Sequence, residues 1–191
     1  MMLKGMNSGH AKVADWGMDH LNKEGAEAIL EIGCGGGRNA GELLKRYPDS
    51  QVTAVDYSSL SVEKATEYNR EAIESGRCVC RQADVSSLPF GDAKFDLATA
   101  FETIYFWPGL ENCFREVSRV LKPGGVFLIV NESDGEDAVS QRFEKIIDGM
   151  KIYTERRIAE ALKAAGFSEV RSDHHTSHPW LTAVAEKQGE R

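Results

Sequence analysis

The stretch ILEIGCGGGRNAGELLKRYP, from Ile29 to Pro48, decides the fold of this chain. A short apolar run is followed by five glycines from Gly33 to Gly41, and a helical pattern follows them. Glycine loses the most backbone freedom on folding, so this cluster indicates that something approaches the main chain closely, and a ligand is the candidate. We expect a strand, a tight loop and a helix whose free N–H groups form an anion site.

Length and composition are typical of one globular domain. The chain has 191 residues, of which 41% are hydrophobic and 28% charged, and no apolar run approaches the roughly 20 residues that span a bilayer. The net charge of -7 argues against a nucleic-acid backbone as the main partner. The N-terminal stretch lacks the pattern of a secretory signal, and the four cysteines form no Cys-x-x-Cys pair. These features predict a cytoplasmic protein with reduced thiols and no membrane partner.

Short β-branched runs alternate with helical patterns along the chain, which indicates an α/β fold with a parallel sheet. The predicted strands are Ala28 to Ile32, Gln51 to Asp56, Cys78 to Ala83, Phe95 to Phe101, Gly125 to Asn131, Ser168 to Asp173 and Leu181 to Glu186. The predicted helices are Arg38 to Arg46, Ser61 to Ser75, Leu110 to Leu121 and Thr154 to Ala165. Right-handed crossovers wind such a series into a Rossmann-like doubly wound sheet with helices on both faces, and ligands bind at the carboxyl ends of its strands.

A dinucleotide site is the first alternative for the glycine loop. The fingerprint G-x-G-x-x-G, read from Gly33, needs Gly or Ala where Arg38 stands. A shifted frame from Gly35 to Ala40 fits the pattern but leaves two extra residues after the strand, which loosens the tight turn. The loop pattern therefore disfavours NAD, and by itself it does not say which other ligand binds.

Three further segments, taken in order, carry a family resemblance. Glu31 to Gly37, Val55 to Ser58 and Gln82 to Val85 resemble the first three motifs of the class I S-adenosylmethionine-dependent methyltransferases, and the resemblance spans roughly Ala28 to Lys187. It implies a seven-stranded, mostly parallel sheet whose last strand is antiparallel, with S-adenosylmethionine as cofactor and S-adenosylhomocysteine as product. The cofactor-binding residues that it implies are Glu31, Gly33, Cys34, Gly35, Gly37, Asp56, Tyr57, Ser58, Asp84, Val85, Phe101 and Glu102.

The resemblance gives these residues distinct roles. Asp56 would accept hydrogen bonds from the ribose hydroxyls, and Asp84 would accept one from the adenine amino group. The segment Phe101 to Thr103 would line the sulfur end of the cofactor and the acceptor. The alternative for each aspartate is structural, because aspartates often cap helices and close turns.

Later segments extend the resemblance, and Tyr153-Thr154 followed by Leu162 and Ala165 to Phe167 is similar to the helix before strand six in the small-molecule branch of this family. Arg119 to Gly125 resembles its passage from a helix into strand five, where Lys122 to Gly125 would end the helix and turn the chain. We expect one domain with four parts: a helical lid at 1–27 that folds over the cofactor, a cofactor-binding core at 28–131, a substrate-covering insertion at 132–153, and a helix with two strands at 154–187. The expected partner is a small-molecule acceptor.

Methyl transfer from a sulfonium requires alignment more than acid–base groups, so no catalytic motif is expected. A general base is needed only for a protonated acceptor, and the candidates are Glu102, Tyr105, His10 and the run with His174, His175 and His178. Adjacent histidines on a strand point to opposite faces, so no metal site is expected there. The run Tyr105 to Pro108 either walls the acceptor pocket, packs beneath a helix or stacks on a base, and the last is the least favoured.

Two other functions share part of this pattern. A non-catalytic protein that senses S-adenosylmethionine would carry the same cofactor motifs and lack turnover. A nucleotide-dependent oxidoreductase would bind NAD instead. Ligand binding separates the oxidoreductase from the other two, and turnover separates the sensor from the enzyme.

Overall fold

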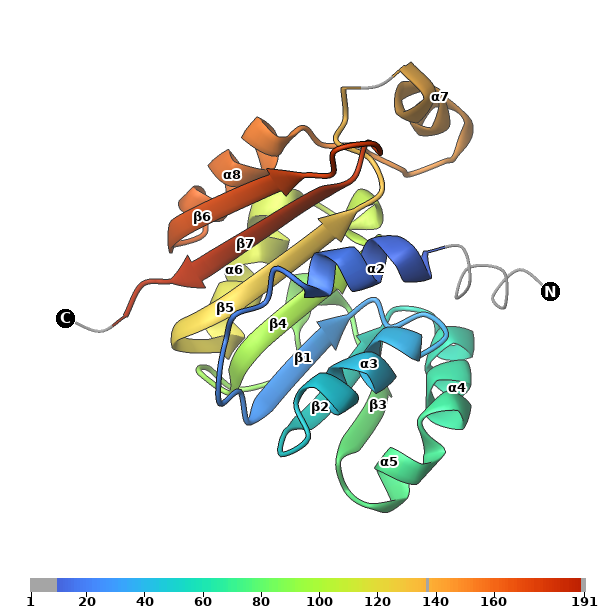
Figure 1. Cartoon of the computed structure of the whole chain (residues 1–191), viewed down its shortest axis with the longest axis vertical. Helices are drawn as coiled ribbons and strands as arrows, with labels where there is room; N and C mark the ends of the chain where they lie inside the picture. Colours follow the sequence, from blue (N-terminus) through green and yellow to red (C-terminus); the bar gives the residue numbers. More distant parts are fainter. Residues whose placement is uncertain (1–9, 137, 190–191) are drawn as a thin grey trace.

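The computed structural model describes residues 10–136 and 138–189, and it contains one seven-stranded sheet with helices on both faces (Figure 1). The strands stand in the order β3-β2-β1-β4-β5-β7-β6. Their bounds are β1 Ala28–Ile32, β2 Gln51–Asp56, β3 Cys78–Gln82, β4 Phe95–Phe101, β5 Leu121–Asn131, β6 Phe167–His174 and β7 Leu181–Lys187. Strand β7 runs antiparallel to both β5 and β6, while β1 to β5 pair in parallel. The predicted Rossmann-like topology, with its antiparallel last strand, is confirmed.

Helices cover both faces of the sheet, and successive side chains of β1 point to opposite faces. Ile29 faces the layer that contains α2 and α3, whereas Leu30 and Ile32 face the layer that contains α6 and α8. Figure 1 shows α2 and α3 in front of the sheet and α6 and α8 behind it. The helices are α2 Ala11–Met18, α3 Arg38–Arg46, α4 Ser59–Tyr68, α5 Arg70–Glu74, α6 Leu110–Val120, α7 Ala138–Ile146 and α8 Glu155–Ala164, with short 3-10 turns η1 Val85–Ser87 and η2 Ile104–Phe106.

Two predicted boundaries are wrong, each for a tertiary reason. The helix predicted from Ser61 to Ser75 is broken at Asn69, whose buried side chain donates to the carbonyl oxygens of Gly37 (2.9 Å) and Ala65 (3.0 Å). Strand β5 begins at Leu121 rather than Gly125 because Leu121 already pairs with Phe95, before a register shift in β4. The helix before it ends at Val120, close to the predicted stop.

Helix α2 and the segment 132–153 both contribute residues to the side of the sheet at the carboxyl ends of the strands, whereas Asn22 to Glu24 lie at the opposite ends. Helix α2 packs on β5, and a Cβ on its Gly17 would stand 2.3 Å from the Val130 side chain. The segment 132–153 contains α7. Most of the predicted lid segment Met6 to His10 lies outside the described residues, so the lid and the substrate cover stay predictions.

All four cysteines are free thiols. Three of them, Cys34, Cys78 and Cys113, are buried, and Cys80 is half-buried. Among the described residues, no helix is both long and apolar enough to cross a membrane.

Candidate functional site

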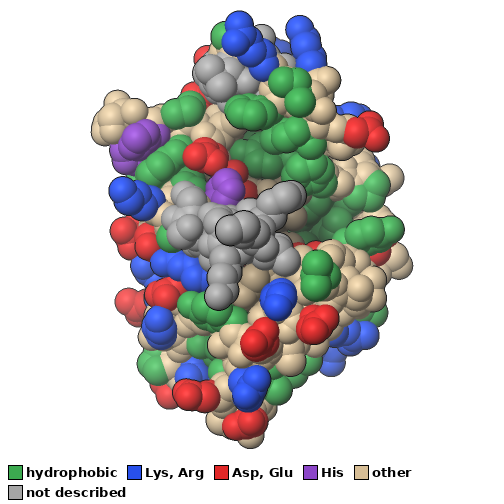
Figure 2. Space-filling model, turned by 90° about the vertical axis from the view of Figure 1, so that its right-hand side faces the viewer, with side chains coloured by type: hydrophobic (Ala, Val, Ile, Leu, Met, Phe, Trp, Pro, Cys, Tyr) green, Lys and Arg blue, Asp and Glu red, His purple; other side chains and the backbone are tan. Residues whose placement is uncertain are grey.

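A cleft of about 900 Å³ opens at the carboxyl ends of the central strands. One side is formed by the β1–α3 loop with the tips of β2 and β3, and the other by the segments that follow β4 and β5 together with α7. Figure 2 shows this face, where hydrophobic side chains gather around a hollow with acidic side chains and a histidine nearby. The cleft lies where a doubly wound sheet binds its ligands.

The loop amides are already engaged within the protein. The N–H groups of Gly33 and Cys34 both donate to the Val55 carbonyl, at 2.8 and 3.0 Å. The Gly35 N–H donates to the Asp56 carboxylate at 2.9 Å. The expectation of free N–H groups therefore fails for the first part of the loop, because these amides tie β1 to the tip of β2.

Three of the loop glycines have different neighbours. Gly33 has a φ of +84°, and a Cβ there would stand 2.3 Å from the Thr103 hydroxyl oxygen. A Cβ on Gly37 would meet the Ala65 backbone at 2.6 Å. Nothing lies within 4 Å of a Cβ built on Gly35, which lines the cleft. Only Gly35 therefore leaves backbone open toward a ligand, while the other two admit parts of the protein.

The Asp56 carboxylate is held in place at the tip of β2. One oxygen accepts the Gly35 amide and the other accepts the Ser58 amide, both at 2.9 Å. The residue lines the cleft and is half-buried. Backbone bonds thus fix the orientation of this carboxylate, and its remaining lone pairs are available to hydroxyls in the cleft.

Asp84 has the structural role that was considered from the sequence, since it closes a turn. One of its carboxylate oxygens accepts from the Ser86 amide (2.8 Å) and the Ser86 hydroxyl (2.7 Å), which caps η1. Asp84 and Val85 also line the cleft. Tyr57 lies at its rim with 77% of its surface exposed.

Three predicted cofactor residues do not line the cleft. Glu31 is 1% exposed, and neither of its carboxyl oxygens has a hydrogen-bond partner among the described residues. Burial raises its pKa well above the usual value. Ser58 caps α4 by accepting from the Ser61 amide (3.3 Å), and Gly37 packs against α4. These residues support the glycine loop from behind.

Glu102 stands directly after β4 with an unusual backbone. Its φ of +57° lies in the left-handed region, which side chains rarely occupy, while its N–H donates to the Val130 carbonyl at 2.9 Å. One oxygen of its carboxylate accepts the Glu132 N–H. This strained position turns the side chain into the cleft beside Phe101.

Glu102, Glu132 and His10 converge at the mouth of the cleft. The His10 Nδ1 atom lies 3.2 Å from an oxygen of Glu132 and 3.8 Å from an oxygen of Glu102. One potential ligand atom from each of the three lies within 4.8 Å of the others, a spacing that would also suit a cation. Sequence reasoning missed Glu132, although its place directly after β5 was a usable signal.

Burial at this point of the cleft raises the pKa values of Glu102 and Tyr105. Burial and the negative charge of Glu132 raise the pKa of Glu102 to about 8, while hydrogen bonds from the Glu132 amide and the Tyr105 hydroxyl act in the opposite direction. Burial, followed by the charge of Glu102, raises the pKa of Tyr105 well above its usual value. Tyr105 therefore stays protonated near neutral pH and serves as a hydrogen-bond group, and its hydroxyl accepts from the Ser133 amide at 3.2 Å.

Apolar side chains form the rest of the cleft. The run after β4 divides between cleft and core, since Phe106 is 54% exposed whereas Trp107 is buried against Phe127. From the other side come Phe143 of α7 and, after it, Ile147 and Met150. Packing beneath a helix is confirmed for Trp107, which contacts Phe114 of α6, and the run also lines the cleft, whose use by an acceptor stays a prediction.

The C-terminal histidines do not form a metal cluster among the described residues. His174 hydrogen-bonds to Glu155 through Nε2 at 2.9 Å, while His178 stacks on Trp180 with centroids 4.4 Å apart. His175 contacts Trp16 of α2 edge to face. These residues connect the β6–β7 turn with α2 and α8.

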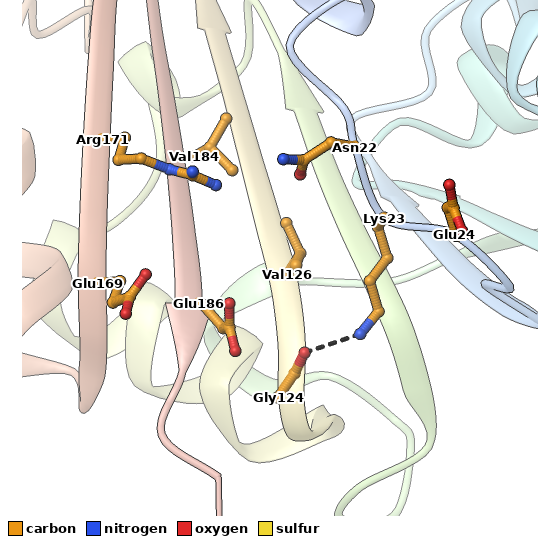
Figure 3. Close-up of a pocket in the computed structure, with 9 residues that line it drawn as sticks. All are labelled: Asn22, Lys23, Glu24, Gly124, Val126, Glu169, Arg171, Val184 and Glu186. Atoms are coloured by element: carbon orange, nitrogen blue, oxygen red, sulfur yellow. Dashed lines mark hydrogen bonds between the residues drawn. The ribbon is translucent and has the colours of Figure 1, made fainter.

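A second hollow, of about 450 Å³, lies at the opposite ends of the strands. Figure 3 shows Arg171 reaching across β7 and Lys23 donating to the Gly124 carbonyl at 2.9 Å, with Glu169 and Glu186 below. It is lined by charged side chains and is remote from the converging groups of the cleft. It shares no lining residue with the cleft.

Comparison with known proteins agrees with this geometry. A family described as a methyltransferase domain matches residues 30–129. The sterol 24-C-methyltransferase erg6 of Aspergillus fumigatus is 31% identical over 176 residues, covering 85% of this chain and 46% of that protein. The 27-O-demethylrifamycin SV methyltransferase of Amycolatopsis mediterranei is 29% identical, covering 86% of this chain and 64% of that protein.

A solved structure shows the same fold. The geranyl diphosphate C-methyltransferase of Streptomyces coelicolor, in complex with Mg²⁺, geranyl diphosphate and S-adenosylhomocysteine, superposes with a TM-score of 0.79 at 18% identity and covers 93% of this chain and 80% of its own. The present chain spans about half the length of the first curated relative. On the family match and the first relative together, the chain belongs to the class I S-adenosylmethionine-dependent methyltransferases.

Proposed function

We propose that this protein transfers a methyl group from S-adenosylmethionine to a small apolar acceptor. One observation carries the proposal: the same cleft joins the open backbone of Gly35 and the fixed carboxylate of Asp56 to an apolar chamber that ends at Glu102. A donor on the first side and an acceptor on the second would meet near Glu102. Family membership supports the same reaction.

The residues present fit the donor. The Asp56 carboxylate has lone pairs for ribose hydroxyls, and the Asp84 and Val85 segment is placed for the adenine ring. No side chain stands between Gly35 and the cleft, so the backbone there can be approached closely. When bound, the donor supplies an activated methyl group on a positively charged sulfur.

The protein's own contribution is placement and exclusion of water. Phe101 and Tyr105 are buried, so they offer fixed surfaces against which an acceptor can be held in line with the methyl group. Phe106 and α7 would close the outer side of the apolar chamber. Holding the reacting atoms collinear in a dry site accounts for most of the acceleration expected for such a transfer.

The size of the cleft supports a small-molecule acceptor. Its 900 Å³ would hold the donor with a compact partner, and its lining is largely apolar on the acceptor side. The relatives named above are a sterol methyltransferase and a rifamycin methyltransferase, and the acceptors in their names are small molecules. We infer an acceptor of that general character.

The decisive variant is Asp56→Asn, compared with Asp56→Ala and with Asp49→Asn as an exposed control. Replacing the carboxylate removes a charged acceptor for the ribose hydroxyls, so affinity for S-adenosylhomocysteine should fall by at least ~1 kcal/mol. Isothermal calorimetry measures the affinity, and thermal unfolding shows whether each variant folds. Unchanged affinity in Asp56→Asn would contradict the role of this residue.

Ligand screening of the unmodified chain tests the proposal as a whole. A ligand at 100 times its dissociation constant adds about 2.7 kcal/mol of apparent stability. S-adenosylmethionine and S-adenosylhomocysteine should raise the melting temperature, and NAD should not. Stabilisation by NAD alone would replace the methyltransferase with an oxidoreductase, and cofactor binding with no turnover of any apolar acceptor would favour a sensor.

A further inference from the structure

We propose that the acceptor is an apolar amine whose ammonium group binds between Glu102 and Glu132, and that Glu102 accepts its proton before methyl transfer. The inference rests on the proposed methyltransferase function and names the class of acceptor. It is carried by the charge of the cleft, by the convergence of three side chains, and by the apolar wall beside them.

The charge balance of the cleft calls for cations. Among its described lining residues, only Arg38 and His10 can be positively charged, against the four carboxylates of Asp56, Asp84, Glu102 and Glu132. Arg38 is neutralised by Asp15, with 2.6 Å between nitrogen and oxygen. The sulfonium of the donor would compensate one carboxylate at the reactive end, and a protonated amine would compensate the second. An acidic acceptor would instead meet like charge.

The geometry supplies a place for that ammonium. The Glu132 amide fixes one oxygen of Glu102, and the other oxygen lies 3.8 Å from His10 Nδ1. That ring nitrogen is buried and has no hydrogen-bond partner among the described residues, although an oxygen of Glu132 lies 3.2 Å away. A donor with several N–H groups, inserted among the three, would bond to both carboxylates and to the imidazole.

The raised pKa of Glu102 suits a general base. Burial and Glu132 raise its pKa to about 8, and the groups that face it are His10, Tyr105 and Glu132. The carboxylate is a stronger base than an ordinary glutamate because its charged form is disfavoured. An arriving cation stabilises that form, so binding of the amine itself draws Glu102 toward ionisation.

The wall of the cleft accommodates an apolar body. Tyr105 and Phe106 come from the segment after β4, while Phe143 and Ile147 come from the opposite side. Aromatic faces attract cations as well as apolar groups, so an ammonium with an aryl or alkyl substituent matches both parts of the chamber. A neutral acceptor would use the wall but would lack charge-assisted hydrogen bonds to Glu102 and Glu132.

The proposed reaction balances in two steps. The ammonium R–NH₃⁺ gives a proton to the Glu102 carboxylate, leaving R–NH₂ and a neutral carboxylic acid. The nitrogen lone pair then forms the N–C bond to the methyl group as the C–S bond breaks, and the electron pair of that bond stays on sulfur. The products are R–NH₂⁺–CH₃, S-adenosylhomocysteine and one proton that Glu102 returns to water.

Binding to the full chain saturated with S-adenosylhomocysteine tests the assignment first. The probes share a phenyl group and differ in the polar group: 2-phenylethylamine, 2-phenylethanol and phenylacetate. A second set carries the same three polar groups on an alkyl chain. Calorimetry should show the amine at least ~10-fold tighter than the alcohol, with the acid weakest. Glu102→Gln and Glu132→Gln should abolish that preference. Glu136→Gln, an exposed carboxylate of the same segment, should keep it.

Turnover tests the role of Glu102. With the best amine, kcat/KM should rise with pH to a plateau above about 8, because only the ionised carboxylate accepts a proton. Glu102→Gln should lose at least ~100-fold in turnover while it still binds S-adenosylhomocysteine, so that the loss is in kcat and not in cofactor binding alone. Circular dichroism of each variant confirms folding.

Several results would overturn the proposal. They are equal affinity for amine and alcohol, no amine of the panel bound at millimolar concentration, or a Glu102→Gln variant with full turnover. Activity that requires Mg²⁺ or Mn²⁺ and disappears in chelator would assign His10, Glu102 and Glu132 to a metal ion instead. Failure to bind S-adenosylhomocysteine at all would overturn the proposed function itself, which distinguishes the two failures.

Discussion

At the scale of single residues, glycine in the β1–α3 loop serves contacts within the protein as much as contact with a ligand. Gly33 has a left-handed backbone and leaves room for the Thr103 side chain, which follows the end of β4. The strained Glu102 stands next to Thr103. Gly33 therefore leaves room for the segment that carries Glu102 to pass close to the β1–α3 loop.

Gly33→Ala should lower the free energy of unfolding by at least about 2 kcal/mol, because a Cβ would overlap Thr103 and the backbone would be strained. Gly25→Ala is the matched control, since its φ is also positive but no atom lies within 4 Å, and it should cost only about 1 kcal/mol. Urea unfolding measures both. Adding Thr103→Ala should recover part of the loss in Gly33→Ala, and no recovery would contradict the steric explanation.

At the scale of elements, Asp96 joins three strands at the ends opposite the cleft. One carboxylate oxygen accepts the amides of Glu27 and Ala28 at the start of β1, and the other accepts the Lys122 ammonium of β5 at 2.8 Å. Burial alone would raise the pKa of Asp96, but the bonds from Lys122, Ala28 and Glu27 outweigh it, so the pKa is lowered. The ionised carboxylate thus holds β1, β4 and β5 together.

A lowered pKa means that this stabilisation is present above the pKa of the unfolded chain and is lost as pH falls toward the folded value. Asp96→Asn should therefore be less stable than the unmodified chain by about 1 kcal/mol at pH 7, and the difference should shrink below about pH 4. Urea unfolding between about pH 3 and pH 7, roughly the range in which carboxylates titrate, measures this difference. Asp49→Asn should show no such dependence, and a constant difference for Asp96→Asn would exclude the linkage.

At the scale of the whole molecule, the cleft is assembled from both ends of the chain. Val13 and Ala14 of α2 are buried and line it, and Phe143 of α7 lines it from the far side. The end of β6 and the turn after it contact α2 and α8, since His175 packs on Trp16 and His174 pairs with Glu155. The position of α2 against β5 is compatible with the predicted lid.

Removing about the first 20 residues should weaken binding of S-adenosylhomocysteine by ~10-fold or more, because α2 forms one wall of the cleft. Calorimetry measures the affinity, and the melting temperature shows whether the shortened chain folds. Removing residues 1–9 alone separates the contribution of α2 from that of the chain before it. Lys12→Ala, on the exposed side of α2, is the control, and unchanged affinity in a folded truncation would exclude the lid.

The sequence by itself determined the order of the elements and the edge at which the site lies. Strand β1, strand β2, strand β4 and helix α3 lie at their predicted bounds, because side-chain periodicity and glycine or proline at the boundaries are local properties. Asp56 ends β2, while Asp84 and Glu102 follow β3 and β4, and parallel strands bring such residues to one edge. The family resemblance singled out these three residues, and all three line the cleft.

Only the tertiary structure decided how side chains from distant segments combine. Glu132 and His10 meet Glu102 although they come from three separate segments, and Glu31 turns away because it shares a strand face with Ile29 beneath α3. Periodicity predicts which face of a strand a residue occupies. It does not predict which layer covers that face or which residues lie opposite. Those contacts depend on packing across the whole chain, and the charge and titration of the site depend on those contacts.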